Sequence, residues 1–121
     1  MNIRPQEILA WAISTFGVIA IRRDERASRF LEEALELAQV EGVSEAMAET
    51  ILARVYSRSC GDVTKEIGQA QLTLECLAEN ISLDADDLAQ QELDRVQRLP
   101  KDYFVRRQNA KAAMGIGGMP S

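Results

Sequence analysis

The stretch Arg29-Phe-Leu-Glu-Glu-Ala-Leu-Glu-Leu-Ala-Gln39 decides how this chain folds, because it reads as a helix with two chemically different sides. At about 100° per residue, Glu32, Glu33 and Glu36 share one sector of the helix and the apolar residues fill the opposite one. The apolar sector consists of Phe30, Leu31, Ala34, Leu35, Leu37 and Ala38. We therefore expect the segment to pack through one side and to present three carboxylates on the other.

These three glutamates are arranged as ligands for a cation. Two carboxylates about 4 Å apart repel each other by on the order of 4 kcal/mol at an effective dielectric of about 20. Such a cluster needs partial protonation, an arginine or a divalent ion, and a hard ion such as Mg²⁺ is the natural partner of carboxylate oxygens. Arg29 precedes Glu32 by three residues and Glu33 by four, so an ordinary ion pair on the helix surface is the alternative.

Length and charge exclude several classes of protein. With 121 residues, of which 46% are hydrophobic, the chain is expected to form one domain with a single small core. The formal net charge of −5 argues against a surface that binds nucleic acid, which needs a basic stripe. No apolar run reaches the roughly 20 residues of a membrane span, and the N-terminus lacks a signal-peptide pattern. We expect a cytoplasmic protein, in the host cytoplasm if viral, that binds neither nucleic acid nor membrane.

The content of cysteine and histidine narrows the possible chemistry. The chain has no histidine, and its two cysteines, Cys60 and Cys76, form neither a CxxC pair nor a disulfide framework. Zinc binding is therefore not expected, and catalysis that depends on histidine is excluded. Any enzyme built on this chain is expected to use carboxylates and a metal.

The hydrophobic pattern predicts helices throughout, since no stretch alternates apolar and polar residues. Residues that stop or cap helices divide the chain at Gly17, Asp24, Ser44, Asp62 and Asp84. The clearest core helix is predicted at 63–80, and a last short helix at 103–113. The predicted class is all-α: a compact antiparallel bundle of about five helices, with one helical domain over residues 1–113 and a flexible tail over residues 114–121. Some apolar faces are wide for so small a unit, so the bundle is expected to complete its core as a homodimer or homotetramer.

A further acidic residue, Glu66, borders the apolar stripe of the helix predicted at 63–80. It lies one turn from the helix N-terminus, where it is placed to meet the acidic helix across the bundle. Glu33, Glu36 and Glu66 would then supply three oxygen ligands from two rigid helices. The polar strip around Glu66 also contains Gln69, Thr73 and Asn80.

These motifs resemble the all-α nucleoside triphosphate pyrophosphohydrolases of the MazG type, whose pattern is ExxE followed by ExxD on a later helix. Glu33-Ala-Leu-Glu36 matches the first half, and Glu66-Ile-Gly-Gln69 occupies the second, with Gln69 in place of a metal-binding aspartate. The closer resemblance is to the MazG-like dATP/dGTP diphosphohydrolase branch, including the phage enzymes called MazZ, whose second motif also tends to lack the aspartate. The similar elements span most of the chain: 11–17, 29–39, 55–58, 66–68, 72–74 and 109–111.

The resemblance implies a MazG-like fold and cleavage of the α–β phosphoanhydride of a purine deoxynucleoside triphosphate, dGTP or dATP, to the monophosphate and pyrophosphate. It implies two or three Mg²⁺ or Mn²⁺ ions, which would offset phosphate charge and lower the pKa of a bound water. Either Glu32 or Glu33 would take the proton of the attacking water. A phage-type enzyme of this kind would adjust a purine pool and supply dGMP for 2-aminoadenine synthesis. The implied metal ligands are Glu32, Glu33, Glu36 and Glu66, with Asp62 or Glu32 replacing the missing aspartate.

Substrate-binding residues are expected outside the acidic motifs. Asn80 is a candidate for the base or sugar, and Trp11 or Phe16 for stacking on a base, with core packing of the two aromatic rings as the alternative. The candidates to hold the outer phosphates are Arg106, Arg107 and Lys111. The alternative for these three cations is that they form a solvated basic end of the chain.

A second hypothesis comes from another class of protein. Gln69 is also compatible with a catalytically silent helical oligomerisation or adaptor module that keeps the fold and has lost the full ligand set. A phosphoribosyl-ATP pyrophosphohydrolase of the same superfamily is disfavoured, because the flanking segments resemble the other branch.

Overall fold

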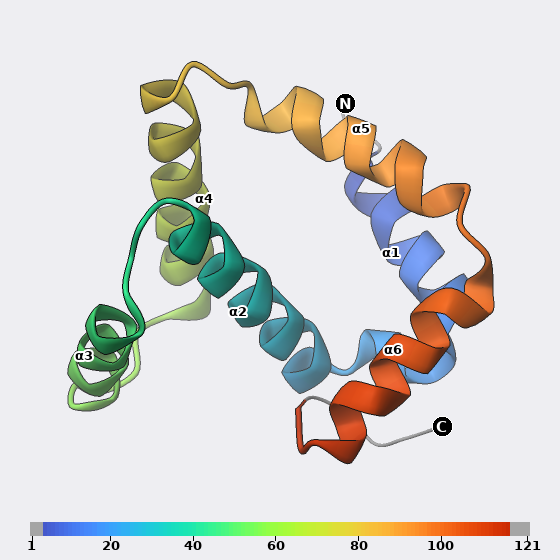
Figure 1. Ribbon diagram of the computed structural model, residues 1–121, viewed down its shortest axis with the longest axis horizontal. Helices are drawn as coiled ribbons and strands as arrows, with labels where there is room; N and C mark the ends of the chain where they lie inside the picture. Colours follow the sequence, from blue (N-terminus) through green and yellow to red (C-terminus); the bar gives the residue numbers. More distant parts are fainter. Residues whose placement is uncertain (1–3, 117–121) are drawn as a thin grey trace. The chain divides into compact units, whose positions relative to one another are not determined.

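The structure is a computed structural model that describes residues 4–116, and its regular elements are all helical (Figure 1). The six α-helices and one 3₁₀ helix are α1 (Arg4–Phe16), η1 (Gly17–Ile21), α2 (Arg23–Val40), α3 (Glu45–Tyr56), α4 (Val63–Asn80), α5 (Ala85–Gln97) and α6 (Lys101–Ala113). No strand occurs between residues 4 and 116. The predicted all-α class is confirmed, and the helical content is consistent with a helical bundle. Across the same residues, none of the helices combines the length and the apolar character that crossing a membrane requires.

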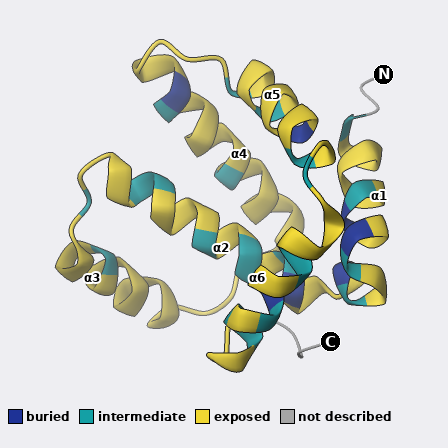
Figure 2. Ribbon diagram, turned by 45° about the vertical axis from the view of Figure 1, so that its right-hand side comes forward, coloured by how far each residue is buried: buried dark blue, intermediate teal, exposed yellow. Residues whose placement is uncertain are grey.

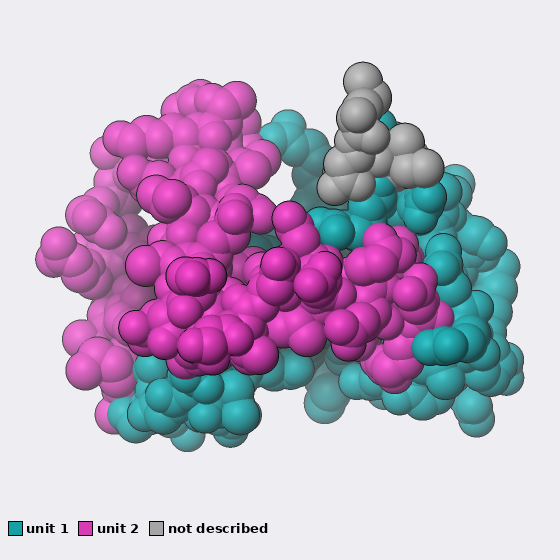
Figure 3. Space-filling model, turned by 90° about the horizontal axis from the view of Figure 1, so that it is seen from above, with its two compact units in different colours: residues 1–45, 97–121 teal, residues 46–96 magenta. Residues whose placement is uncertain are grey.

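The chain divides into two compact units, drawn in teal and magenta in Figure 3. Unit 1 consists of residues 1–45 and 97–121 and holds α1, η1, α2 and α6. Unit 2 consists of residues 46–96 and holds α4 and nearly all of α3 and α5. The predicted division into a domain of residues 1–113 and a tail stays a prediction. Residues 114–116 form a turn that continues α6, and residues 117–121 lie outside the described residues.

The core of unit 1 is a cluster of aromatic rings between α1 and α6. Trp11 meets Phe16 and Phe104 edge to face, with ring centroids 5.9 and 5.1 Å apart. Such T-shaped pairs place the positive edge of one ring against the negative face of another, which stabilises the contact beyond the buried area. Ala12 of α1 and Ala20 of η1 are buried in the same unit. Trp11 thus packs against other aromatic rings of this unit, which is the alternative to base stacking that the sequence left open.

Three helices end in Schellman motifs, in which a residue with left-handed backbone follows the helix and two backbone N–H groups turn back to its last carbonyls. The left-handed residues are Gly42 (φ 96°) after α2, Ser82 (φ 60°) after α4 and Gly115 (φ 80°) after α6. Glycine adopts this conformation without steric cost, whereas serine does not. The closing hydrogen bonds run from Val43 N to Ala38 O (3.0 Å), from Leu83 N to Ala78 O (2.9 Å) and from Ile116 N to Lys111 O (2.9 Å).

The predicted helix starts at Ser44, Asp62 and Asp84 are confirmed, because a helix begins at the next residue in each case, and the predicted start at Asp24 is wrong. The carboxylate of Asp62 accepts from Lys65 N, and that of Asp84 accepts from Asp87 N at 3.0 Å, as N-caps of α4 and α5. Asp24 does not cap α2, because the helix already begins at Arg23. Its carboxylate lies within the first turn and accepts hydrogen bonds from the Arg22 guanidinium and from Glu25 N.

Most residues of the helices are exposed in the single chain, as the predominantly yellow ribbons of Figure 2 show. They include many large apolar side chains. None of the residues of α3 is buried, and the buried residue of α4 is Ala78. Ile67 and Leu72 of α4 are 66% and 70% exposed. The prediction that α4 is the best-buried helix is therefore wrong for one copy of the chain. The apolar side of α2 is also open, with Phe30, Leu31 and Leu35 exposed.

Candidate metal centre

Helix α2 brings three carboxylates together on one side. Because Glu32 and Glu36 are four residues apart, they lie one turn apart on the same face, and Glu33 follows beside them. One oxygen atom from each of Glu32, Glu33 and Glu36 lies within 4.8 Å of the other two. Glu32 is half-buried, whereas Glu33 and Glu36 are exposed. The structure thus gathers the three glutamates that the sequence singled out on this helix.

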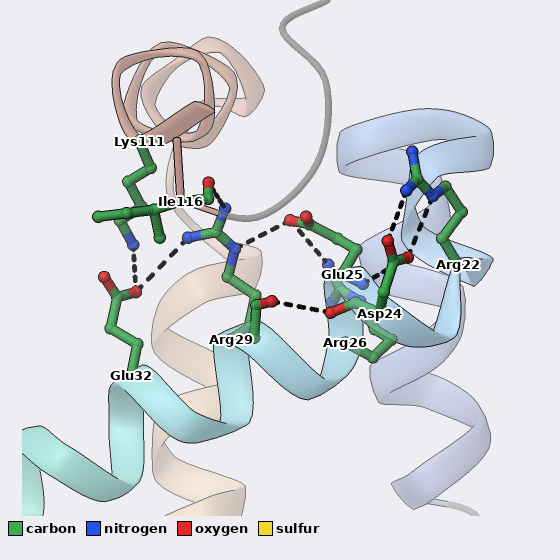
Figure 4. A network of polar contacts seen from close by, with 9 residues as sticks. Arg22, Asp24, Glu25, Arg26, Arg29, Glu32, Lys111 and Ile116 are labelled. Atoms are coloured by element: carbon green, nitrogen blue, oxygen red, sulfur yellow. Dashed lines mark hydrogen bonds and ion pairs between the residues drawn. The ribbon is translucent and has the colours of Figure 1, made fainter. Parts of the chain in front are cut away.

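Glu32 already has cations beside it. Lys111 of α6 donates from Nζ to its Oε1 at 2.6 Å, and Nη1 of Arg29 lies 3.6 Å from the same oxygen (Figure 4). The hydrogen bond and charge of Lys111, with the charge of Arg29, hold the pKa of Glu32 below its ordinary value of 4.5. Lys111, predicted to bind phosphate, therefore lies at the carboxylate cluster. The ion pair between Arg29 and Glu32, considered as an alternative to metal binding, is also present.

The surroundings of Glu33 shift its pKa in the opposite direction from that of Glu32. Partial desolvation, together with the neighbouring carboxylates of Glu36 and Glu32, raises its pKa above 4.5, while Lys111 and Arg107 partly offset that rise. A carboxylate with a raised pKa beside others of the same sign is poorly compensated, so an added cation would stabilise its charged form. Glu33 is consequently the member of the cluster best suited to hold a proton or a metal.

A buried ion pair that the sequence interpretation missed lies next to this cluster. Glu25 is fully buried, and its Oε1 accepts from Nε of Arg29 at 2.9 Å (Figure 4). The four-residue spacing of Glu25 and Arg29 on a helix is the one signal that could have pointed to the pair. Nothing in the local sequence distinguishes it from an exposed pair, because burial here depends on the elements that cover α2.

Glu66, the fourth predicted metal ligand, lies on the first turns of α4 in unit 2, where its backbone N–H donates to Asp62 O at 2.9 Å. Its carboxylate folds over the preceding loop, so that a Cβ atom added to Gly61 would come within 2.8 Å of Glu66 Oε1. Gln69 accepts at its backbone carbonyl from Thr73 Oγ1. The joint action of Glu66 with the glutamates of α2 stays a prediction.

The remaining substrate-binding candidates are spread over both units. On α6, Arg106 donates to the carbonyl of Asp102, while Arg107 donates to the Tyr103 hydroxyl at 3.1 Å and lies 5.4 Å from its ring centroid. Asn80 is exposed at the end of α4. The contacts of these side chains are local, and their predicted roles toward substrate stay predictions. Of the cationic candidates, Lys111 contacts the cluster directly.

The donor set of α2 fits a hard divalent cation. It consists of carboxylate oxygens alone, it is open to solvent at Glu33 and Glu36, and its unfavourable charge at Glu33 would be relieved by a metal. Glu32 fits on the condition that Lys111 gives up its hydrogen bond. Comparison of the chain with protein-family models, with curated proteins and with solved structures gave no match.

Proposed function

We propose that this protein is a metal-dependent nucleoside triphosphate pyrophosphohydrolase. It would cleave the α–β phosphoanhydride of a purine deoxynucleoside triphosphate and release the monophosphate and pyrophosphate. The observation that carries the proposal is the convergence of three carboxylate oxygens within 4.8 Å of one another, beside a lysine of α6. Glu32, Glu33 and Glu36 would hold Mg²⁺ or Mn²⁺, with Glu66 as a further ligand, and the ions would supply charge neutralisation of the triphosphate.

Glu33 is the better candidate for the general base. Lys111 and Arg29 favour the charged, proton-free form of Glu32, whereas the raised pKa of Glu33 brings proton uptake closer to neutral pH. A water oxygen would attack the α-phosphorus. The bond from the α-phosphorus to the oxygen that bridges the α- and β-phosphates would break. The water proton would pass to Glu33, and the electron pair of the broken bond would leave with pyrophosphate.

Lys111 has two partners available in this proposal. In the free protein it is bonded to Glu32 at 2.6 Å. If a bound metal neutralised Glu32, the ammonium group of Lys111 would be free to bind an outer phosphate of the substrate. Arg107, whose charge already reaches Glu33, is the second cation of α6 placed to do so.

The choice of a purine deoxynucleotide rests on the resemblance to the dATP/dGTP diphosphohydrolase branch. The elements that carry it include the segment 29–39, with its doubled acid, and the segment 109–111, which contains Lys111. The role implied is the adjustment of a phage purine pool, with dGMP as a precursor for 2-aminoadenine.

We further propose that the working form is a homodimer or homotetramer. Exposed apolar side chains recur at helical spacing on α3 and α4, where Ile51, Val55 and Ile67 are at least 50% exposed. Extended apolar faces of this kind are unusual for a monomer and are commonly buried between subunits.

The decisive experiment is an assay of the purified protein with each deoxynucleoside triphosphate and with Mg²⁺ or Mn²⁺. Monophosphate and pyrophosphate in equal amounts are the expected products, with dGTP or dATP turned over fastest. Glu36→Gln removes one carboxylate charge from the cluster and should abolish turnover while the helical circular dichroism is kept. Glu41→Gln is the matched control, because it neutralises an exposed glutamate just after the end of the same helix.

The second candidate is a catalytically silent oligomerisation or adaptor module. The exposed apolar faces of α3 and α4 favour it, and so does Gln69 in place of an aspartate. An absence of turnover for all substrates, together with no rise in melting temperature on addition of Mn²⁺, would reject the hydrolase and support the module.

A further inference from the structure

Glu25 is a buried carboxylate that the proposed reaction does not use. It is fully buried, and it is the one large side chain of the described residues with that degree of burial. Two arginines of the same helix approach its Oε1, Arg29 at 2.9 Å and Arg26 at 3.8 Å. A carboxylate is tolerated in such a place where cations and hydrogen bonds replace its lost hydration.

Arg29 contacts the buried carboxylate of Glu25 and also two other groups, the carboxylate of Glu32 and the carbonyl of Ile116. Its Nη1 lies 3.6 Å from Oε1 of Glu32, and its Nη2 donates to the carbonyl of Ile116 at 3.4 Å (Figure 4). The guanidinium is planar, so the direction of its Nε–H fixes the directions of the other N–H groups. By accepting from Nε, Glu25 thus determines where Arg29 points on the side of Glu32 and Ile116.

Both groups that Arg29 meets belong to the surroundings of the candidate metal centre. Glu32 is one of its three carboxylates, and Ile116 closes the Schellman motif that ends α6 through its bond to Lys111 O. Lys111 in turn bonds to Glu32. Arg29 therefore contacts the same carboxylate as Lys111 and the same capped turn that carries Lys111.

The charge of Glu25 partly offsets the charge of Arg29. Arg29 therefore orients Glu32 while adding less positive charge there than an unpaired guanidinium would, and Lys111 remains the cation that a metal would have to displace. Without the charge of Glu25, Arg29 would carry an uncompensated positive charge 3.6 Å from Glu32 and would compete with an incoming cation. Nη1 of Arg29 is buried and makes no hydrogen bond within residues 4–116, so it has a donor available for closer contact.

We infer that Glu25 is a positioning residue, which fixes Arg29 so that Glu32 and the capped end of α6 keep their places beside the metal centre. The part of this inference that concerns metal affinity rests on the proposed function. The part that concerns Arg29 and the end of α6 does not. Glu25 itself contacts no substrate.

The test compares Glu25→Gln with the control Glu41→Gln in two measurements. In the first, amide hydrogen exchange at Gly115 and Ile116 should become about tenfold faster in Glu25→Gln, while the equivalent cap at Leu83 in unit 2 is unchanged. In the second, the dissociation constant for Mn²⁺, measured on the protein without nucleotide, should rise about tenfold in the same variant. Glu41→Gln should change neither quantity.

Two further variants separate positioning from general loosening. Gly115→Ala strains the cap of α6 without altering a charge, so it should speed exchange at Ile116 and leave the Mn²⁺ affinity close to that of the wild type. In an Arg29→Met background, Glu25→Gln should add nothing further to either measurement, because its effect passes through Arg29. Full additivity of the two substitutions would overturn the inference.

Each remaining outcome is also decisive. A folded Glu25→Gln protein with unchanged exchange at Ile116 rejects the inference. If that variant does not fold, Arg29→Lys takes its place, since lysine keeps the charge and loses the planar fork; the same faster exchange is expected, and unchanged exchange rejects the inference. If the wild type binds no Mn²⁺, the proposed function fails, and the exchange data still decide whether Glu25 positions Arg29.

Discussion

Glu32 and Glu33 are neighbours on α2, yet their surroundings move their pKa values in opposite directions. Lys111 and Arg29 lower the pKa of Glu32, whereas partial desolvation and two nearby carboxylates raise that of Glu33. A group with a lowered carboxyl pKa stabilises the fold above the ordinary value of 4.5 and loses this contribution as the pH falls through its folded value. A raised carboxyl pKa has the reverse effect, because the charged form costs stability above it.

The two glutamates should therefore respond in opposite ways to neutralisation. In metal-free buffer at about pH 7, Glu32→Gln is expected to lower the melting temperature and Glu33→Gln to raise it. As the pH falls toward about 3, Glu33 becomes protonated and the contribution of Glu32 is lost as the pH passes through its lowered folded pKa, so the difference between the variants should shrink. Thermal unfolding followed by circular dichroism at both pH values measures this. Equal shifts of the same sign at neutral pH would contradict the assigned surroundings.

A single added methyl group at Gly61 should displace the carboxylate of Glu66. The Cβ atom of Gly61→Ala would lie 2.8 Å from Glu66 Oε1, which is the mobile end of a side chain and can move away cheaply. We expect the free energy of unfolding to change by no more than about 0.5 kcal/mol. If Glu66 is a metal ligand, kcat/KM should fall by about tenfold. Unchanged turnover would show that the carboxylate of Glu66 is not a metal ligand.

At this scale, helical spacing was sufficient to predict that Glu32, Glu33 and Glu36 gather, because all three lie within five residues of one helix. The contact of Lys111 with Glu32 spans 79 residues, and no local pattern contains it. Lys111 was singled out through resemblance, as a phosphate ligand, and its carboxylate partner came from the structure. Glu25 was missed because burial is set by packing and not by its own sequence neighbours.

Among the secondary-structure elements, the three Schellman motifs differ in one residue. Glycine supplies the left-handed backbone after α2 and α6, and Ser82 supplies it after α4 at φ 60°. The Cβ atom of an L-residue costs roughly 1 to 2 kcal/mol in this conformation. Glycine removes that cost, although part of the gain is lost to the greater entropy of the unfolded chain.

Ser82→Gly should accordingly stabilise the protein by about 0.5 to 1 kcal/mol, which corresponds to a rise of a few degrees in melting temperature. The reverse change at an equivalent position, Gly42→Ala, should destabilise it by about 1 kcal/mol. Urea unfolding of the two variants alongside the wild type measures both values. A loss of stability in Ser82→Gly would show that the serine side chain outweighs its backbone strain.

The boundaries of the elements followed from local chemistry where that chemistry is unambiguous. The predicted helix at 63–80 coincides with α4, because Asp62 caps its start and its apolar spacing continues to its end. The start of α2 was misplaced, since Arg22 binds the carboxylate of Asp24 that was expected to cap the helix. Gly115 was assigned to a glycine-rich tail, and its capping role depends on the turn formed by the residues on either side of it.

For the molecule as a whole, the contrast between many apolar residues and few buried ones is the main feature. The buried apolar residues of the described chain are Ala12, Ala20, Ala78 and Leu93, three of which are alanines. So small a set contributes little of the burial that normally drives folding. Helical periodicity predicts which residues form an apolar face, but it cannot show whether that face is covered by the same chain or by another copy.

Ile67→Glu should weaken self-association while leaving the secondary structure of the chain in place. Ile67 is 66% exposed in one copy, so a carboxylate there costs little within the chain but would be costly in an apolar interface. We expect the association constant to fall by about tenfold or more. Lys65→Glu places a carboxylate on the opposite face of α4 and serves as the control. Sedimentation velocity over a range of concentrations measures both, and a monomeric wild type at all concentrations would contradict the proposed oligomer.

Trp11 is the single tryptophan of the chain, and it lies in the aromatic cluster of unit 1. Its fluorescence emission therefore reports on the contact between α1 and α6 within unit 1. Far-UV ellipticity, in contrast, sums over all the helices. Superimposable denaturation curves from the two signals would mean that the units melt in one cooperative step, and separated curves would mean that each unit melts independently.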